Sequence, residues 1–470
     1  MRTIVSPIFR QFILNKYPAL VGNTPYLRFF GYLCFSDFFD PDSNRLVIPT
    51  KTIAEHFYEQ PYHPTFNGKE KLEQFRDQVL PGLTWTEHEP FSASSYRGKA
   101  REIVSLGFDE AMQEALRQEC LSPQENRVDL LTGRAFQRKD RYHLTADATA
   151  AYQQEVDRSV LNDTQKSILD YLRRIKYGHL LLRKLTDNRA VIQQAIDSLP
   201  SHLQTIRYRI LHQVRQNPTV YYLPSSEERT CRLSARGDCI LGLKREVRRA
   251  ATRGWVECDL RSSQFVILAA TLKAPVSQEF IASGRSLWRE FYHHTHGVDD
   301  VPPTDVKAVF KEAIYSLCFG KGEANLKRFL RHHDVGSLAK HPIMVELLTL
   351  RRQWLQRIER NGGAPDVWGQ WQATDDTIDP VTGKTKRWAG SVAAAVIQSI
   401  EMEIIAPIFD VARKHGTSDQ FTIALFQHDG ATISFRSHEK QARAQRKLKD
   451  AVEARAKQLG VSTVLEYSPL

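Results

Sequence analysis

Apolar residues recur at intervals of three and four in the segment that begins near Asn162, which is the spacing of one face of an α-helix. The pattern predicts a first helix there, a second over residues 188–199 and a third over residues 201–216. In the third helix the periodicity places apolar positions inward and three basic residues outward, namely Arg207, Arg209 and Arg215. We therefore expect amphipathic helices with a basic outer face.

Strand-like patterns are fewer. Short runs of β-branched and aromatic residues predict strands within residues 219–259, on both sides of a turn in residues 421–435, and at the C-terminal end. Longer apolar patterns predict helices over residues 262–283, 305–331, 391–414 and 439–459. A turn-rich stretch at residues 361–389 predicts a hairpin insertion. Helices and strands together indicate an α+β chain.

The length and charge of the chain narrow the classes of function. With 470 residues, of which 41% are hydrophobic, it can bury two or three ordinary domain cores. The net charge is +11, and residues 160–253 carry almost all of this excess, with 18 Lys or Arg against 8 Asp or Glu. Such a concentration is typical of a surface that grips nucleic-acid phosphates, although a solvated basic surface would give the same count.

The cysteines and the N-terminus indicate an intracellular setting. Six cysteines are scattered without a Cys-x-x-Cys pair, which favours neither a zinc ribbon nor a disulfide framework. Charged residues and a proline stand where a signal peptide needs an unbroken apolar stretch, and no apolar run of about 18 residues occurs. We expect a cytoplasmic protein, associated with the nucleoid or acting in host cytoplasm, with no membrane partner.

Two aspartates stand at the ends of predicted strands, where a carboxylate can hold a metal ion. Asp259 ends a strand-like run that turns directly into an apolar helix, and Asp429 lies at the bend of a hairpin. Between them in sequence, a predicted helix carries Lys307, Lys311 and Tyr315 four residues apart, so they share one face. Two carboxylates and a lysine-bearing helix are the parts that a two-metal phosphoryl-transfer site requires.

Several motifs, in this order, resemble those of the family A DNA polymerases, whose best-known member is bacterial DNA polymerase I. The residues that carry the resemblance are 230–234 (Thr-Cys-Arg-Leu-Ser), 259–269 (Asp-Leu-Arg-Ser-Ser-Gln-Phe-Val-Ile-Leu-Ala), Lys307, Lys311, Tyr315, Phe319, Gly320, Gln398, and 428–430 (His-Asp-Gly). Spacing carries more weight than any single motif, since Asp259 and Lys307 are 48 positions apart and Gln398 and Asp429 are 31 apart. The resemblance covers about residues 160–470.

The resemblance implies an α+β fold of the right-hand polymerase type, with an antiparallel palm sheet, a helical thumb and fingers, and a small N-terminal domain. The implied divisions are an accessory domain at 1–155, a basic helical thumb at 156–218, a first palm segment at 219–275, fingers with the hairpin insertion at 276–390, and a second palm segment at 391–470. No strand typical of a proofreading exonuclease is visible in the first part, which is a candidate contact for replication accessory proteins.

The resemblance also implies roles for single residues. Two Mg²⁺ ions, for which Mn²⁺ can substitute, would be held by Asp259, Asp429 and the carbonyl of Leu260. The nucleoside triphosphate would contact Lys307, the catalytic Lys311, Tyr315, Gln264, Phe319 and Leu260. The primer-template nucleic acid would contact Arg232, Gln398, His428, Arg248 and Arg249. The implied activity is that of a DNA polymerase, a nucleotidyltransferase that extends a primer along a template, as in phage or plasmid replication.

Departures from the family pattern leave alternatives open. Gln264 stands where the family has the glutamate that blocks a 2′-hydroxyl, and Phe319 stands where that glutamate's tyrosine partner would be. Gly430 replaces the hairpin glutamate. Relaxed sugar selectivity would favour a primase or RNA polymerase of the same fold. A replication initiator that binds nucleic acid without catalysis is the other alternative.

Overall fold

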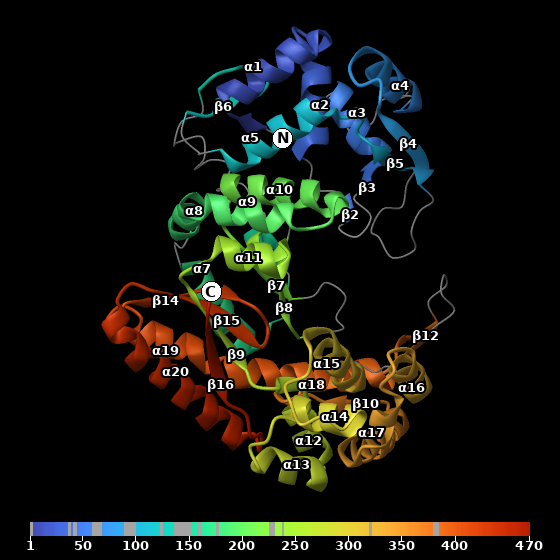
Figure 1. The fold of residues 1–470 in the computed structure, drawn as a ribbon, viewed down its shortest axis with the longest axis vertical. Coiled ribbons are helices and arrows are strands. Elements are labelled where there is room, and N and C mark those ends of the chain that lie inside the picture. The colour runs from blue at the N-terminus through green and yellow to red at the C-terminus, as the bar shows by residue number, and fades with distance from the viewer. Residues whose placement is uncertain are drawn as a thin grey trace. The chain divides into compact units, whose positions relative to one another are not determined.

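The structure is a computed structural model. It describes residues 3–35, 39–40, 45–58, 68–88, 100–122, 126–135, 150, 152–157, 159, 161–174, 178–224, 231–236, 239–318, 322–378 and 385–470. The chain folds into two compact units (Figure 1). Unit 1 comprises Met1–Arg158, Lys176–Tyr221 and Ala235–Arg253, and unit 2 comprises Ser159–Ile175, Tyr222–Ser234 and Gly254–Leu470. The boundaries of the five divisions expected from the sequence do not coincide with this partition, and the five divisions stay predictions.

Unit 1 is built around a central helix, α10 (Ser201–Gln216), which packs against α2 (Thr24–Phe35), α5 (Glu110–Leu121) and α9 (Arg189–Asp197). An antiparallel sheet has the order β2 (Phe39–Asp40), β3 (Arg45–Pro49), β5 (Ala100–Ser105) and β4 (Thr84–His88). The other elements are β1 (Ile4–Val5), α1 (Pro7–Lys16), α3 (Thr50–Tyr58), α4 (Gly68–Gln78), β6 (Val128–Asp129), α8 (Gly178–Asp187) and α11 (Arg245–Ala251).

The prediction that α10 turns its arginines outward is wrong. Arg207, Arg209 and Arg215 are 3%, 1% and 3% exposed, because neighbouring helices cover several sides of α10 rather than one. The guanidinium of Arg207 donates to the carbonyl of Gly242 at 2.9 Å, and that of Arg215 donates to the carbonyls of Ser122 and Leu185. Arg207 and Arg215 therefore satisfy backbone acceptors inside unit 1, as buried donors must.

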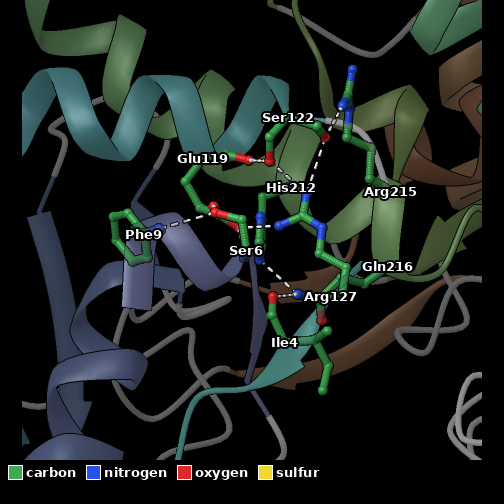
Figure 2. Close-up of polar contacts among 9 residues, drawn as sticks. All are labelled: Ile4, Ser6, Phe9, Glu119, Ser122, Arg127, His212, Arg215 and Gln216. Atoms are coloured by element: carbon green, nitrogen blue, oxygen red, sulfur yellow. Dashed lines mark hydrogen bonds and ion pairs between the residues drawn. The ribbon is translucent and has the colours of Figure 1, made fainter. Parts of the chain in front are cut away.

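A buried ion pair lies beside α10, drawn in Figure 2. The carboxylate of Glu119 accepts hydrogen bonds from the backbone N–H of Ser6 at 3.0 Å, from the Ser6 hydroxyl at 2.5 Å and from Arg127. We call these three residues the Glu119 cluster. Arg127 also donates to the carbonyl of Ser122 at 3.0 Å. Burial raises the pKa of Glu119, while Arg127 and Ser6 act in the opposite direction.

Unit 2 holds a four-stranded antiparallel sheet. Its order is β14 (Phe421–Phe426), β15 (Gly430–Phe435), β9 (Val256–Leu260) and β16 (Leu465–Pro469). The helix α19 (Pro407–His415) packs against β14, and α20 (His438–Gln458) packs against β16 and α19, which Figure 1 shows in the red part of the chain. The expected hairpin at residues 421–435 and the last strand are thus present, and both join one sheet with the strand that carries Asp259.

Helices form the rest of unit 2. They are α7 (Asp163–Arg174), α12 (Ser263–Leu272), α13 (Pro275–Ala282), α14 (Leu287–His296), α15 (Thr304–Cys318), α16 (Glu323–His332), α17 (Pro342–Asn361) and α18 (Ala389–Ile405). Two short hairpins, β10 (Gly363–Pro365) with β11 (Trp371–Ala373) and β12 (Asp375–Ile378) with β13 (Thr385–Arg387), occupy the expected insertion. The mixed helical and antiparallel-sheet class predicted from the sequence is confirmed.

A long apolar helix lies in the core of unit 2. By length and composition, the span Ala389–His415 could cross a membrane, but 72% of its apolar window is buried inside the protein. Within unit 2, α18 packs against α12, α15 and α17. The apolar composition of α18 is therefore explained by this packing, since a helix that is hydrophobic all round is typical of a protein core.

Candidate active site

The strand register brings Asp259 and Asp429 together. Asp259 is the fourth residue of β9 and pairs directly with Gly430, the first residue of β15. The backbone N–H of Leu260 donates to the carbonyl of Asp429 at 3.2 Å. The two aspartates come from adjacent strands, at the end where β9 turns into α12 through Ser262, whose φ of 49° makes the turn tight.

A glycine between the aspartates is required by the close approach of the strands. A Cβ at Gly430 would lie 2.3 Å from the carbonyl oxygen of Cys258 and 3.2 Å from Oδ1 of Asp259. Any side chain there would force β9 and β15 apart. A glutamate at this position, which the resemblance would predict, is therefore excluded by steric conflict.

A third carboxylate, which the sequence analysis missed, comes from α18. Glu401 is 1% exposed and accepts hydrogen bonds from Arg232 and from the side-chain amide of Gln264. The hydroxyl of Ser263 hydrogen-bonds to both Asp429 and Glu401 and lowers the pKa of each. We call Asp259, Asp429 and Glu401 the acidic centre.

Burial and mutual repulsion dominate the electrostatics of the acidic centre. Desolvation, followed by the charge of Asp429, raises the pKa of Asp259 to about 8, although part of the Asp259 surface still reaches solvent. Burial also raises the pKa of Asp429 and that of Glu401, while Arg232 opposes both shifts. Like charges held in a desolvated setting destabilise their ionised forms, so the centre favours the arrival of a cation.

The helix α15 supplies the predicted lysine face. Its other face, formed by Phe310, Ala313, Ile314 and Leu317, is buried, and the helix packs against α12 and α18. Lys307 and Lys311 are partly exposed, and Tyr315 is 40% exposed. The charges of Asp429 and Asp259 help burial raise the pKa of Tyr315 to about 12, so the tyrosine lies within electrostatic reach of the acidic centre.

The end of α15 is tied to the start of α12. The thiol of Cys318 donates to the backbone carbonyl of Gln264 at 3.5 Å, which fixes the helix carrying Tyr315 beside the helix carrying Gln264. Phe319, the next residue along the chain and a predicted nucleotide contact, lies outside the described residues.

The predicted nucleic-acid contacts lie in both units. In unit 2, Arg232 pairs with Glu401, Gln398 is buried one turn before Glu401 on α18, and His428 precedes Asp429 in the hairpin. Burial lowers the pKa of His428 to about 4, so the ring is neutral at physiological pH. Arg248 and Arg249 lie on α11 of unit 1, and their part in the same site stays a prediction.

The donor set of the acidic centre fits a divalent cation that shares its ligands with a substrate. Within the described residues, no group of three or more His, Cys, Asp and Glu side chains converges as a metal site. Mg²⁺ is commonly bound by one or two carboxylates plus substrate phosphates and water rather than by an all-protein cage. Asp259 and Asp429 match this arrangement, and the raised pKa of Asp259 shows the excess negative charge that an ion would neutralise.

Comparison with known proteins gives a weak likeness to a solved structure. No protein-family model matches the sequence. No curated protein matches it either. Among solved structures, the chain is similar to the POL domain of Pol1 from M. smegmatis in complex with DNA primer-template and dNTP, at a TM-score of 0.43 and 16% sequence identity. The match covers 70% of this chain and 64% of that chain, which is less than two thirds of its length. At this TM-score the likeness carries no argument, so the assignments below rest on the acidic centre.

Proposed function

We propose that the protein is a template-directed nucleotidyltransferase, a DNA polymerase that extends a primer by phosphoryl transfer assisted by two metal ions. The observation that carries the proposal is the pairing of Asp259 with the residue after Asp429 across two adjacent strands. In this register the two aspartates come from adjacent strands, with Tyr315 of α15 within electrostatic reach.

In this proposal Asp259 and Asp429 hold the metal ions, and the carbonyl of Leu260 completes one site. Bound Mg²⁺ would neutralise charge on the transferred phosphoryl group and lower the pKa of the attacking hydroxyl, and Mn²⁺ could substitute. The chain's own contribution is to hold the carboxylates rigidly. The strands approach so closely at Gly430 that there is no space for a Cβ between Cys258 and the aspartates.

The face of α15 would bind the nucleoside triphosphate. Lys311 and Lys307 lie one and two turns before Tyr315 on the same face, so their ammonium groups can meet phosphate oxygens as point charges. Tyr315, which keeps 40% of its surface exposed, would stack near the sugar and base. Template and primer would contact Arg232, Gln398 and His428, with Arg248 and Arg249 adding salt-dependent affinity for phosphates.

A second candidate, a primase or RNA polymerase of similar mechanism, is favoured by one specific observation. Gln264 is bound to Glu401 and lies at the start of the helix that follows Asp259. The resemblance would place at this position a glutamate that blocks a 2′-hydroxyl, and Gln264 replaces it. Residues 1–155 would bind replication accessory proteins, and the protein would act in the cytoplasm, as a phage or plasmid replicase would.

Primer extension decides between these candidates. Purified full-length protein is incubated with Mg²⁺, a primed template and either deoxyribonucleotides or ribonucleotides, with and without the primer. We expect incorporation that falls by at least about 10²-fold in Asp429→Asn. A matched control is Asp410→Asn, because Asp410 is an exposed carboxylate paired with Arg413 on α19.

The outcomes separate the alternatives. Products formed from ribonucleotides without a primer would support the primase or RNA polymerase. If the wild type and Asp429→Asn incorporate nothing and bind nucleic acid equally in the presence of a chelator, the protein is a non-catalytic initiator and the proposed function is wrong.

A further inference from the structure

We propose that Trp371 and Trp388 form a stacking platform for the bases of an unpaired nucleic-acid strand. The two residues are 56% and 44% exposed, and both lie in the segment that joins α17 to α18. Four of the seven tryptophans of the chain fall within residues 354–388, so this segment concentrates them. We call Trp371 and Trp388 the tryptophan platform. The inference rests on the proposed function in one respect, namely that the strand is the one copied at the acidic centre.

The first observation is a hairpin turn that is held from inside. Asp366, which is 8% exposed, follows β10 and begins the turn that leads into β11. Its Oδ1 accepts hydrogen bonds from the backbone N–H groups of Trp368 at 3.0 Å and Gln370 at 2.9 Å. Its Oδ2 accepts from the side-chain amide of Gln372 at 2.8 Å. One buried carboxylate therefore fixes the whole turn, since aspartate bonds of this kind define turn geometry.

The same turn is anchored to the helices of unit 2. The indole N–H of Trp368 donates to Oε2 of Glu403 at 2.8 Å and to Oγ1 of Thr164 at 3.1 Å. The backbone N–H of Val367 donates to the hydroxyl of Ser399 at 3.1 Å. Glu403 and Ser399 both belong to α18, against which β10 and β11 pack. The hairpin therefore keeps a fixed position on α18.

Trp371 is the exposed tryptophan of this anchored hairpin. It begins β11 opposite Pro365, and its indole lies against the backbone of Gly363. A Cβ at Gly363 would lie 2.8 Å from the indole nitrogen of Trp371, so only glycine leaves room for the ring there. Burial of an aromatic ring is strongly favourable. A rigid scaffold that leaves more than half of a tryptophan exposed therefore indicates that a ligand covers the ring.

Trp388 lies in the same part of unit 2. The pairing of β12 with β13 sets Asp375 opposite Arg387, the residue before Trp388. Asp375 follows Trp371 by four residues, so the length of the connecting chain keeps the two tryptophans within roughly 25 Å of each other. A strand of about 12 nucleotides, each spanning ~3.4 Å, is long enough to contact both rings.

The surroundings of the tryptophan platform suit a nucleic-acid strand. Residues 351–360 of α17, which packs against β10, include four arginines and one glutamate. Arg357 and Arg360 are exposed on the last turns of this helix, and Gln370 is exposed beside Trp371. Flat rings among polar and basic groups match a ligand that alternates flat bases with phosphates. A protein partner would instead favour a contiguous apolar patch.

The strand must be unpaired where it meets the tryptophan platform. Bases in a duplex stack on one another, whereas the bases of a single strand can stack on aromatic side chains. Trp388 directly precedes α18, and Glu401 lies thirteen residues later, about 20 Å along the helix. The platform is therefore separate from the acidic centre, at a distance that about six stacked nucleotides span.

Equilibrium binding in the presence of a chelator tests the inference without turnover. Fluorescence anisotropy measures the affinity of the full chain for a labelled single-stranded deoxyoligonucleotide of about 12 nucleotides, an abasic strand of the same length and a blunt duplex. We expect Trp371→Ala and Trp388→Ala each to weaken single-strand affinity about tenfold, because each variant loses a stack with a base. Trp371→Phe, which keeps an aromatic ring, should stay within about threefold of the wild type. Affinity for the abasic strand and the duplex should change by less than about twofold, since phosphate contacts are retained.

Trp288→Ala is the control, because Trp288 is a partly exposed tryptophan on α14 and lies outside the tryptophan platform. It should bind all three probes as the wild type does. An equal loss of affinity for the abasic strand in the platform variants would overturn the inference, because the lost contact would not be a base stack. Unchanged single-strand affinity in the double variant Trp371→Ala/Trp388→Ala would overturn it too, and would leave a protein as the partner of the platform.

Primer extension reports separately on the proposed function. A wild type that incorporates no nucleotide but loses single-strand affinity in the platform variants contradicts the proposed function and leaves the stacking site standing. A wild type that incorporates nucleotides while the platform variants bind the strand normally contradicts the inference and leaves the proposed function standing.

Discussion

Two glutamates, one in each unit, are buried to the same degree but are surrounded by different charged and polar groups. Glu119 is 2% exposed and Glu401 is 1% exposed, and each forms an ion pair with an arginine. The partner of Glu119, Arg127, has a side chain that is 1% exposed, whereas the partner of Glu401, Arg232, is 21% exposed. Glu119 has Ser6 as its other partner, whereas the charge of Asp429 raises the pKa of Glu401.

The difference lies in how the negative charge of each glutamate is compensated. In the Glu119 cluster, one carboxylate is matched by a guanidinium, a hydroxyl and a backbone N–H, so its negative charge is compensated from within. In the acidic centre, Arg232 lowers the pKa of Asp429 and that of Glu401, whereas the charges of Asp429, Glu257 and Glu401 all raise the pKa of Asp259. Charge that a protein buries without compensating it is costly, and an external cation or substrate is the usual reason for keeping it.

The largest expected effect tests how much the buried pair of Glu119 and Arg127 contributes to stability. Glu119→Gln removes the charge that compensates Arg127 and leaves a buried cation, which should destabilise the protein by about 3 kcal/mol. The measurement is the free energy of unfolding in urea. Glu114→Gln on the same helix is the control, because Glu114 pairs with Arg117 at the surface and should cost about 0.5 kcal/mol or less. Equal losses in both variants would mean that the buried pair is no stronger than a surface pair.

The next effect tests the steric fit of the acidic centre. Gly430→Ala places a Cβ 2.3 Å from the carbonyl oxygen of Cys258, and overpacking of this kind should destabilise the protein by about 2 kcal/mol. Nucleotide incorporation should fall as well, because separation of the two strands moves Asp259 from Asp429. Gly322→Ala is the control, since a Cβ at Gly322 meets nothing within 4 Å. Unchanged stability and activity in Gly430→Ala would show that the strands have more freedom than the register indicates.

A smaller change in the free energy of unfolding is expected for Glu401→Gln, the counterpart of Glu119→Gln. Glu401→Gln should change the free energy of unfolding by about 1 kcal/mol or less, because lost hydrogen bonds to Arg232 are offset by relief of repulsion from Asp259 and Asp429. The same urea titration measures it. A loss as large as that of Glu119→Gln would remove the distinction between the two glutamates.

Much of the acidic centre was predictable because it depends on local sequence. The strand that ends at Asp259, the turn into an apolar helix and the hairpin that carries Asp429 each span a few residues. The separation of Asp259 and Asp429 in the sequence does not predict that they lie close together. A position at a strand end or in a hairpin turn nevertheless restricts where each carboxylate can lie. Lys307, Lys311 and Tyr315 could be placed on one helical face for the same reason.

The burial of the α10 arginines and the position of Glu401 depend on which elements pack together. Local periodicity does not encode this packing. The arginines of α10 looked outward because an amphipathic pattern was assumed to have one apolar side, yet neighbouring helices surround them. Glu401 could have been noticed as a charge in an otherwise apolar helix. The same helix also carries Glu403, and nothing in the spacing says which glutamate faces the aspartates.

The smallest expected effect is a gain in stability. Its pH dependence tests whether repulsion between Asp259 and Asp429 destabilises the folded protein. Burial and the charge of Asp429 raise the pKa of Asp259 to about 8, above the value of about 3.9 for an unfolded chain. The folded protein therefore holds a proton that the unfolded chain has released. This contribution to stability is present in full below about pH 4 and is lost as the pH rises towards 8.

Asp429→Asn removes the repulsion and should stabilise the metal-free protein by about 1 kcal/mol at pH 8, with little change at pH 4, where Asp259 is protonated in the folded protein and no repulsion remains. Melting temperatures across this pH range, measured in a chelator, give the comparison. Added Mg²⁺ should raise the melting temperature of the wild type more than that of the variant, since the ion compensates charge that the variant no longer has. A variant that is less stable than the wild type at pH 8 would mean that Asp429 is held by favourable contacts, as Glu119 is, and that the acidic centre carries no unbalanced charge.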